Sequence, residues 1–220
     1  MGTVASLRSA LARRFDVAFD FARSDDVVRV GTGVPGVDRL LSGGIAKGTL
    51  TEVFGDASTG RTSLLLALVA NATSLGECCA WVDVADTFDP LSAFEAGVDL
   101  ARVLWVNCAG NAEHGLQAAD LLTQAGGFGV VVLDLADTAE REAKRIPLAS
   151  WFRLRHAAER QGTALVVAGA RVTAPSCSSA QVRMHRKRPV WVGKLLNGIL
   201  AEAESRKHYR SQVAEFMAVR

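Results

Sequence analysis

The sequence predicts an α/β protein with a mostly parallel sheet flanked by helices and antiparallel strands at its C-terminal end. Three observations support this class. Apolar strand-like runs alternate with helical stretches, a glycine-rich loop joins the first core strand to a helix, and short alternating runs crowd residues 181–216. Strands that are apolar on both faces are typical of a parallel sheet covered by helices. With 220 residues, 49% of them apolar, the chain can bury one such core.

The elements are expected in a regular order along the chain. Residues 1–30 form an N-terminal arm that includes an amphipathic helix at 4–15, and residues 31–220 form one core domain. Core strands are expected at 49–54, 78–84, 102–106, 129–135 and 163–169. Helices are expected at 36–41, 61–75, 90–97, 113–125 and 147–161. Short antiparallel strands are expected at 181–185, 190–192, 199–204 and 209–216.

Charge is distributed unevenly along the chain. Residues 1–150 hold 12 basic and 19 acidic side chains, whereas residues 151–220 hold 13 basic and 4 acidic ones. A basic end of this kind predicts an acidic partner, either DNA or protein, although a solvated basic face is the alternative. The candidate binding residues are Arg183, Arg186, Lys187, Arg188, Lys194, Arg206, Lys207 and Arg210.

The sequence also indicates a cellular location and the absence of some kinds of site. The charged residues 1–20 do not resemble a signal peptide, and no apolar run reaches the roughly 18 residues needed to span a membrane. None of the four cysteines forms a C-x-x-C pair, so a zinc site is not expected. These features favour a protein of the reducing cytoplasm without membrane contact.

The glycine-rich loop at residues 55–63 follows the P-loop pattern G-x-x-x-x-G-K-[ST], except that Arg61 replaces the lysine. Glycines let main-chain N–H groups approach phosphates, and the Thr62 hydroxyl would bind Mg²⁺. The planar guanidinium of Arg61 is larger than an ammonium group and is directed differently, and Asp56 adds repulsion. We therefore expect binding of ATP with Mg²⁺ to be weak or lost. The candidate nucleotide residues are Gly55, Ser58, Thr59, Gly60, Arg61, Thr62 and Ser63.

Two aspartates end neighbouring apolar strands and are candidates for the chemistry of hydrolysis. Asp134 ends the run from residue 130 and is expected near the Mg²⁺, together with Thr62. Hydrolysis also needs a group that orients or deprotonates water, which would come from residues 81–86. Asp83 is the candidate best placed for that role.

The order of these features resembles the RecA-type recombinase core over roughly residues 30–208. Residues 33–41 look like the segment that precedes the P-loop in that family. Residues 81–90 resemble the strand that carries the family's catalytic glutamate, and residues 96–99 resemble its L-G-V-D stretch.

Several positions depart from the pattern of that family. Ala85 stands at the position of the catalytic glutamate, and Ser92 stands where an aromatic ring would stack on adenine. Asp89, the neighbouring base contact, is kept, whereas Gly169 occupies the end of the strand where the family has a γ-phosphate sensor. The two DNA-binding loops look shortened, at 136–147 and 171–180.

Among RecA-like proteins the chain is most similar to the ImuA family of bacterial mutasome accessory factors, and the related SulA division inhibitors are shorter. The resemblance implies a nucleoid-associated scaffold of SOS-induced translesion synthesis with a degenerate ATPase site. Its implied partners are a Y-family polymerase-like protein and an error-prone replicative polymerase, with RecA and DNA as further candidates. Two alternatives stay open: an active DNA-dependent ATPase that uses Asp83 or Asp86, and a regulator that inhibits RecA or cell division.

The arm carries two short patterns, Phe15 with Ala18 and Phe19 with Ala22. They resemble the motif through which recombinase subunits dock an arm on a neighbour, which would imply self-association through Phe15, Phe19 and Ala22. Ordinary packing of these side chains is the alternative.

Overall fold

The computed structural model describes residues 27–218, apart from 137, 139, 144, 175 and 208–209. For residues 140, 206, 207, 210 and 211 it describes the backbone alone. The helix expected at 4–15 and the docking residues Phe15, Phe19 and Ala22 therefore lie outside the described residues. The boundary between arm and core at residue 30 stays a prediction.

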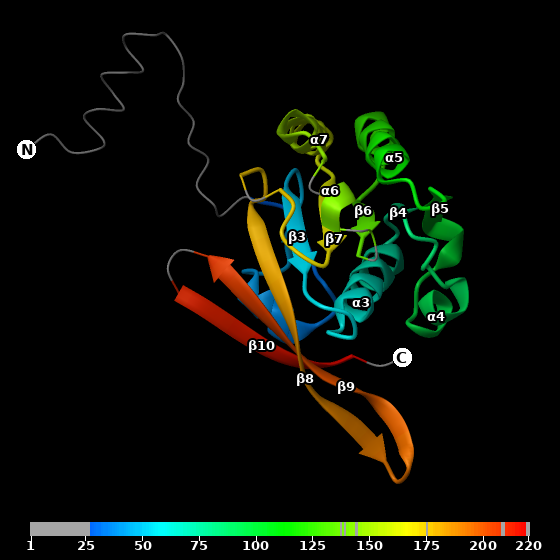
Figure 1. Cartoon of the computed structure of the whole chain (residues 1–220), viewed down its shortest axis with the longest axis vertical. Helices are drawn as coiled ribbons and strands as arrows, with labels where there is room; N and C mark the ends of the chain where they lie inside the picture. Colours follow the sequence, from blue (N-terminus) through cyan, green and yellow to red (C-terminus); the bar gives the residue numbers. More distant parts are fainter. Residues whose placement is uncertain are drawn as a thin grey trace, which may run out of the picture.

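An eight-stranded sheet forms the centre of the described chain, in the order β10-β9-β8-β3-β7-β6-β4-β5 (Figure 1). Neighbouring strands from β8 to β5 are parallel, and β9 and β10 are added antiparallel. The bounds in this order are Arg210–Ala218, Leu195–Lys207, Ala180–Val192, Leu50–Phe54, Ala164–Gly169, Val130–Leu135, Cys79–Asp83 and Val103–Asn107. This arrangement confirms the predicted α/β class with its antiparallel end.

Helices cover both faces of the parallel part of the sheet. Helix α3 lies on one face, and α5 and α7 lie together on the other (Figure 1). The helices are α2 (Pro35–Leu40), α3 (Arg61–Ser74), α4 (Pro90–Glu95), the 3₁₀ helix η2 (Leu100–Arg102), α5 (Ala112–Ala125), α6 (Glu140–Ala143) and α7 (Leu148–Gln161). A small ladder of β1 (Arg29–Val30) and β2 (Ile45–Ala46) precedes β3. None of the described helices is long and apolar enough to cross a membrane.

Two apolar clusters hold these layers together. Leu65 and Leu68 of α3 belong to the cluster on one face, and Trp151 and Leu154 of α7 belong to the cluster on the other. Strands β3, β4, β6 and β7 are buried along their whole length. Burial on both faces explains why these strands are continuous apolar runs in the sequence instead of alternating ones.

The C-terminal strands are longer than the sequence predicts. The runs at 181–185 and 190–192 belong to one strand, β8, whose register against β9 shifts between Arg186 and Arg188 and again between Val190 and Trp191. Such β-bulges interrupt the alternation of side chains, so the sequence pattern breaks where the strand continues. Strand β8 pairs with β3 only over residues 180–183, and the remaining length forms a hairpin with β9 that projects from the sheet (Figure 1).

Candidate nucleotide site

The candidate site lies where β3 ends and α3 begins. The strand registers align Val53, Ala168, Asp134 and Asp83 in one row across β3, β7, β6 and β4. Val53 and Ala168 belong to the cluster packed on α3. Because side chains alternate between the faces of a sheet, the two aspartates lie on that same face. The structure therefore brings both predicted carboxylates to the side of the sheet that carries the P-loop helix.

The main chain of the loop has the shape of an anion site. Gly60, with φ of 86°, precedes the 14 residues of α3, and Ser58 has φ of 58°. The Thr59 hydroxyl donates to the Asp56 carbonyl at 2.8 Å and closes the turn. Within the described chain, no group accepts a hydrogen bond from the main-chain N–H groups of residues 57–62. Free N–H groups at the start of a long helix attract anions, so this backbone fits a phosphate group.

The side chain that replaces the P-loop lysine is directed into the protein. Nη1 of Arg61 donates to the Gly55 carbonyl at 2.7 Å and to the Gly169 carbonyl at 2.8 Å. Only 7% of Arg61 is exposed. Because Nη1 carries two hydrogens, both of its donors are used by these carbonyls. Arg61 therefore ties the end of β3 to the end of β7 beneath the loop.

The two glycines of the loop pattern are required by packing as well. A Cβ on Gly55 would lie 2.4 Å from the Met184 carbonyl oxygen of β8. A Cβ on Gly60 would lie 3.0 Å from Cβ of Ala201 in β9 and 3.1 Å from Cβ of Ala218 in β10. The loop thus packs directly on the C-terminal strands, and its glycines alone do not demonstrate phosphate binding.

Two cavities flank the loop. One of about 290 Å³ lies between residues 58–63 and the side chains of Leu196, Ile199 and Ala218. This largely apolar space adjoins the loop and has few polar groups, as is typical of ligand pockets.

The other cavity, of about 270 Å³, is lined by residues 54–57 and 59 and by basic side chains. Arg171, Arg183 and Arg186 all face it. Nη2 of Arg171 lies 3.6 Å from Oδ1 of Asp56, which reduces the repulsion that this carboxylate would exert on an anion. Sequence reasoning missed Arg171, although its place two residues beyond β7 could have indicated it.

The predicted metal ligands occupy suitable elements. Thr62 is exposed in the first turn of α3, and Asp134 is 5% exposed near the end of β6. One Asp134 oxygen accepts a hydrogen bond from the Ala136 N–H at 3.0 Å. A hydroxyl and a carboxylate are oxygen ligands of the kind that Mg²⁺ prefers, and binding of the metal by these two residues stays a prediction.

Asp83, the candidate base, is a fully buried carboxylate. It accepts hydrogen bonds from the N–H groups of Thr87 at 3.1 Å and Phe88 at 2.9 Å, and from Nε1 of Trp105 at 3.3 Å. These bonds anchor the loop after β4 and the edge strand β5. The geometry argues against a role in activating water, and Ala85, in the bend that follows β4, carries only a methyl group.

Asp89, the candidate base contact, begins helix α4. Its carboxylate accepts hydrogen bonds from the N–H groups of Leu91 at 3.2 Å and Ser92 at 3.1 Å, and also from the Ser92 hydroxyl. The Ser92 hydroxyl, followed by the main-chain N–H groups, lowers the pKa of Asp89. The structure thus gives Asp89 a helix-capping role, and contact with a base stays a prediction.

The basic end is partly neutralised by carboxylates on neighbouring strands. Nζ of Lys187 lies 2.7 Å from Glu202 and 4.0 Å from Glu215, and the hydrogen bond with Glu202 raises the pKa of Lys187. Nε2 of His185 lies 3.1 Å from Glu204. Lys187 is therefore poorly suited to contact a phosphate backbone.

The other predicted basic residues fall into two groups. Arg186, Arg188 and Lys194 are exposed, Arg183 is half-buried, and no described carboxylate lies within ion-pair distance of these four. The side chains of Arg206, Lys207 and Arg210 lie outside the described part, although their backbone continues β9 and β10. Binding of DNA or of a protein partner by these residues stays a prediction.

Glu52 is a buried charged residue that sequence reasoning missed. One carboxylate oxygen accepts from the N–H groups of Thr173 and Ala174, both at 2.7 Å, and the other lies 3.3 Å from Nε2 of Gln181. Only 2% of Glu52 is exposed. It fixes the short connection between β7 and β8, where the second shortened loop was predicted. A carboxylate inside an otherwise apolar strand is the signal that could have revealed it.

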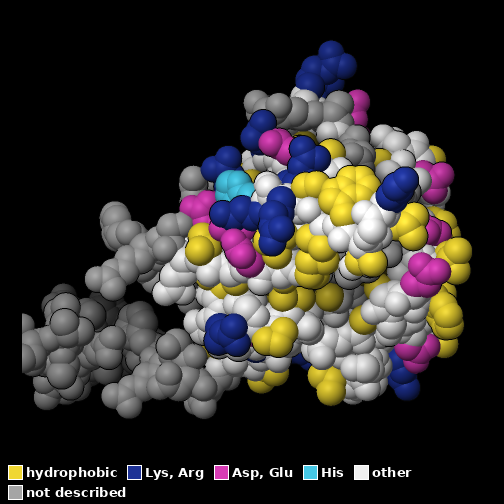
Figure 2. Space-filling model, turned by 90° about the horizontal axis from the view of Figure 1, so that it is seen from below, with side chains coloured by type: hydrophobic (Ala, Val, Ile, Leu, Met, Phe, Trp, Pro, Cys, Tyr) yellow, Lys and Arg dark blue, Asp and Glu magenta, His cyan; other side chains and the backbone are white. Residues whose placement is uncertain are grey.

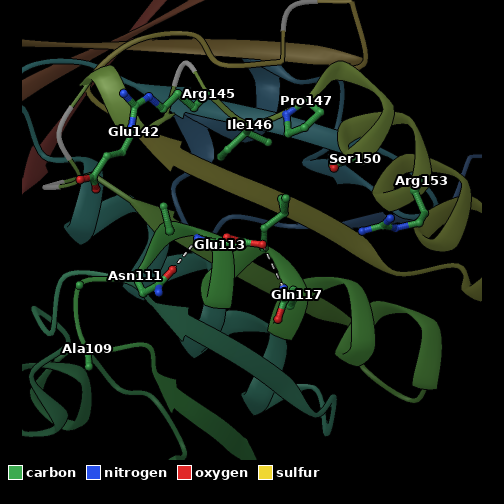
Figure 3. Close-up of a pocket in the computed structure, with 13 residues that line it drawn as sticks. Ala109, Asn111, Glu113, Gln117, Glu142, Arg145, Ile146, Pro147, Ser150 and Arg153 are labelled. Atoms are coloured by element: carbon green, nitrogen blue, oxygen red, sulfur yellow. Dashed lines mark hydrogen bonds between the residues drawn. The ribbon is translucent and has the colours of Figure 1, made fainter.

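A cavity of about 650 Å³ lies on the opposite face of the sheet. Figure 3 shows Glu113 and Gln117 of α5 on one side and residues 145–150 on the other. Its charged side chains have both signs, and Arg153 is already paired with Asp120 at 2.9 Å. Nothing in this lining selects a particular class of ligand.

Comparison with known proteins agrees with the fold and the loop. Residues 18–144 match the model of the RecA N-terminal domain. The chain belongs to the RecA N-terminal domain family. The matched residues contain the P-loop, α3 and strand β6 with Asp134, whereas β7 to β10 lie beyond them.

Curated relatives of the RecA family match half of this chain. Protein RecA of Haemophilus ducreyi is 34% identical over 110 residues, that of Laribacter hongkongensis 36% over 112 residues, and that of Rickettsia massiliae 36% over 110 residues. Each alignment covers 50% of this chain but only 29%, 31% and 32% of the respective relative. The matched chain thus spans less than a third of the length of these relatives.

Proposed function

We propose that this member of the RecA family acts as an interaction protein in the response to DNA damage and does not hydrolyse ATP. One observation carries the proposal. The Arg61 guanidinium, which stands in place of the phosphate-binding lysine, binds the carbonyls of Gly55 and Gly169 and is nearly buried. It therefore stabilises the junction of two strands and does not face the phosphates.

Phosphoryl transfer needs a cation on the transferred group and a side chain that positions the attacking water. In this chain the guanidinium cation of Arg61 binds main-chain carbonyls instead of phosphate. Asp83 is buried and residue 85 is alanine, so neither positions the attacking water. The free N–H groups of residues 57–62, with Thr62 and Asp134, support weak binding of a nucleotide with Mg²⁺. A nucleotide would then be a structural ligand and not a substrate.

The resemblance to the ImuA family supports a more specific role, as a scaffold in damage-induced translesion synthesis. The partners would be a Y-family polymerase-like protein and an error-prone replicative polymerase, with RecA as a third candidate. Two features support protein partners over DNA. Glu202 already pairs with Lys187, which reduces the basic charge available to phosphates, and Glu52 holds the connection after β7, where a DNA-binding loop was expected, in a compact form.

A nucleotide assay tests the proposed chemistry. The purified full chain is incubated with ATP and Mg²⁺, with and without single-stranded DNA, and phosphate release is followed beside the variants Arg61→Ala and Asp134→Ala. We expect no turnover above that of the variants, while calorimetry with a non-hydrolysable ATP analogue reports weak binding or none. Turnover that Asp134→Ala abolishes would contradict the proposal and favour an active DNA-dependent ATPase.

A second experiment tests the proposed partners. A tagged full chain is purified from cells treated with a DNA-damaging agent, and co-purifying proteins are identified by mass spectrometry. We expect the two polymerases to co-purify with the chain from damaged cells and not from undamaged cells. Recovery of only RecA or of a cell-division protein would favour the regulatory alternative instead.

A further inference from the structure

The end of the β8–β9 hairpin exposes four large apolar side chains, which we call the tip patch. They are Trp191, Val192, Leu195 and Leu196, exposed to 57%, 62%, 76% and 53%. Figure 2, seen from the end at which the hairpin projects in Figure 1, shows hydrophobic side chains gathered on this face with Lys and Arg side chains beside them. Val192 lies opposite Leu195 and Trp191 opposite Leu196, so the first pair is on one face of the hairpin and the second pair is on the other, where Leu196 also lines the cavity beside the loop. Exposed apolar side chains gathered at one projecting end are typical of an interaction site.

The geometry of the sheet explains why the tip patch is uncovered. Pairing of β8 with β3 ends at Arg183, and pairing of β10 with β9 ends where Ala218 lies opposite Ile199. Beyond these points β8 and β9 pair only with each other, and Val192 lies opposite Leu195 beside the turn at Gly193, whose φ is 62°. The apolar side chains are therefore held on a two-stranded support, with no further strand of the described residues beside it.

Charge near the tip patch selects the chemistry of an occupant. Arg188 and Lys194 are the only charged residues between positions 188 and 200, and both are exposed. The nearest carboxylates along β9, Glu202 and Glu204, are already paired with Lys187 and His185. The tip is thus an apolar surface with a positive charge, which complements an acidic partner.

The composition of the tip patch favours a protein over nucleic acid. Trp191 could stack a base, but the other three members are aliphatic and provide no ring for stacking. The free edge of β8 is also poorly suited to accept an added strand, because it carries two register shifts and Pro189, which has no N–H. Contact would therefore be made through side chains.

We propose that the tip patch docks an acidic segment of a partner protein that also carries large apolar side chains. The apolar groups supply affinity by leaving water, and Arg188 and Lys194 select the acidic partner. The inference rests on the proposed function only in that the chain works through protein contacts. The two proposals can fail separately. If the chain neither binds such peptides nor hydrolyses ATP, only the proposal for the tip patch is refuted. If the chain binds the peptides but hydrolyses ATP, only the proposed non-hydrolysing role is refuted.

The test uses short random peptides displayed on phage and selected on the full chain. We expect enrichment of peptides that combine Asp or Glu with Leu, Phe or Trp. Selected peptides are then titrated by fluorescence anisotropy at low and high salt. Val192→Ser combined with Leu195→Ser should weaken binding by about tenfold or more, as expected for residues central to an interface. Arg188→Glu combined with Lys194→Glu should weaken it too and remove most of its salt dependence.

The matched control is Leu75→Ser combined with Leu121→Ser, two leucines that are exposed to 72% and 69% on other elements. This control should bind like the wild type. Circular dichroism verifies that each variant is folded. The variant Arg188→Glu with Lys194→Glu still tests the tip patch if the serine variant loses its hairpin. Three results would overturn the proposal: selected peptides without acidic residues, tip variants that bind them normally, or tip substitutions that instead abolish binding of an oligothymidylate or self-association of the chain.

Discussion

Replacing Arg61 tests whether this side chain is a structural tie or a phosphate ligand. In the structure its Nη1 group donates to the carbonyls of Gly55 and Gly169, and the second of these lies 108 residues further along the chain. Arg61→Ala would leave both carbonyls without this donor next to the packed core. We therefore expect the variant to be less stable even in the absence of any nucleotide.

The magnitude follows from two opposing contributions. The Gly55 carbonyl loses the Arg61 donor, which costs about 1–3 kcal/mol, whereas the Gly169 carbonyl still accepts from the Gly55 N–H at 3.2 Å. Arg61 is a nearly buried cation with no described carboxylate within ion-pair distance. Because burial of an unpaired charge is unfavourable, its removal offsets part of the lost free energy of unfolding. The net loss should be about 1–2 kcal/mol, which in a domain of this size lowers the melting temperature by about 2–8 °C. Arg61→Lys should recover part of the loss, because an ammonium group still donates to carbonyls.

Urea unfolding followed by circular dichroism measures the effect. Thr62→Ala is the matched control, because Thr62 is exposed and adjacent, and its removal should change the unfolding free energy by about 0.5 kcal/mol or less. One result would refute the reasoning. If Arg61→Ala unfolded at the wild-type midpoint but lost the stabilisation that ATP and Mg²⁺ confer on the wild type, Arg61 would be a phosphate ligand.

Three further predictions concern single side chains. Glu52→Ala should lower the unfolding free energy by about 3 kcal/mol or more, because buried N–H groups of residues 173–174 lose their acceptor; an unchanged urea midpoint would contradict this. In the native protein only the exposed Cys78 should react rapidly with a chromogenic disulfide, because burial raises the pKa of Cys79 to about 12 and the other two cysteines are buried. Cys78→Ser should remove this fast phase of the reaction. A second rapidly reacting thiol would refute the assignment. Because the pKa of Asp89 is lowered in the folded state, its carboxylate stabilises the fold at pH values above its pKa in the unfolded chain. This contribution is lost as the pH falls through the pKa of Asp89 in the folded state. Asp89→Ala should therefore lower the melting temperature at neutral pH but not in acid, and an equal effect at both would count against the cap.

The predicted loop illustrates how far a local pattern can be trusted. Its position between β3 and α3 and the alignment of Asp134 on the same face follow from strand and helix periodicity, which the sequence displays directly. The residues that pack against the loop cannot be predicted from this periodicity. Gly55 and Gly60 fit a phosphate, but Met184, Ala201 and Ala218 also leave no room for a larger residue there, and these neighbours come from strands that begin more than a hundred residues later.

The basic end shows the same division. The excess of basic residues after position 150 is visible by counting. Whether a given charge is free depends on the register of β8 against β9, which places Glu202 beside Lys187 and leaves Arg188 and Lys194 exposed. That register includes two β-bulges, and a shift of one residue moves every side chain to the other face.

By itself, the sequence determined the α/β class, the order of the core elements and the site of a P-loop, because these depend on local periodicity and on glycines at fixed spacing. Only the tertiary structure decided that Arg61 turns inward, that Asp83 is buried and that the β8–β9 hairpin exposes an apolar end. The physical reason is that a side chain takes the direction in which acceptors and apolar neighbours are available. In this protein those neighbours are supplied by β7 to β10, far along the chain from the loop that they modify.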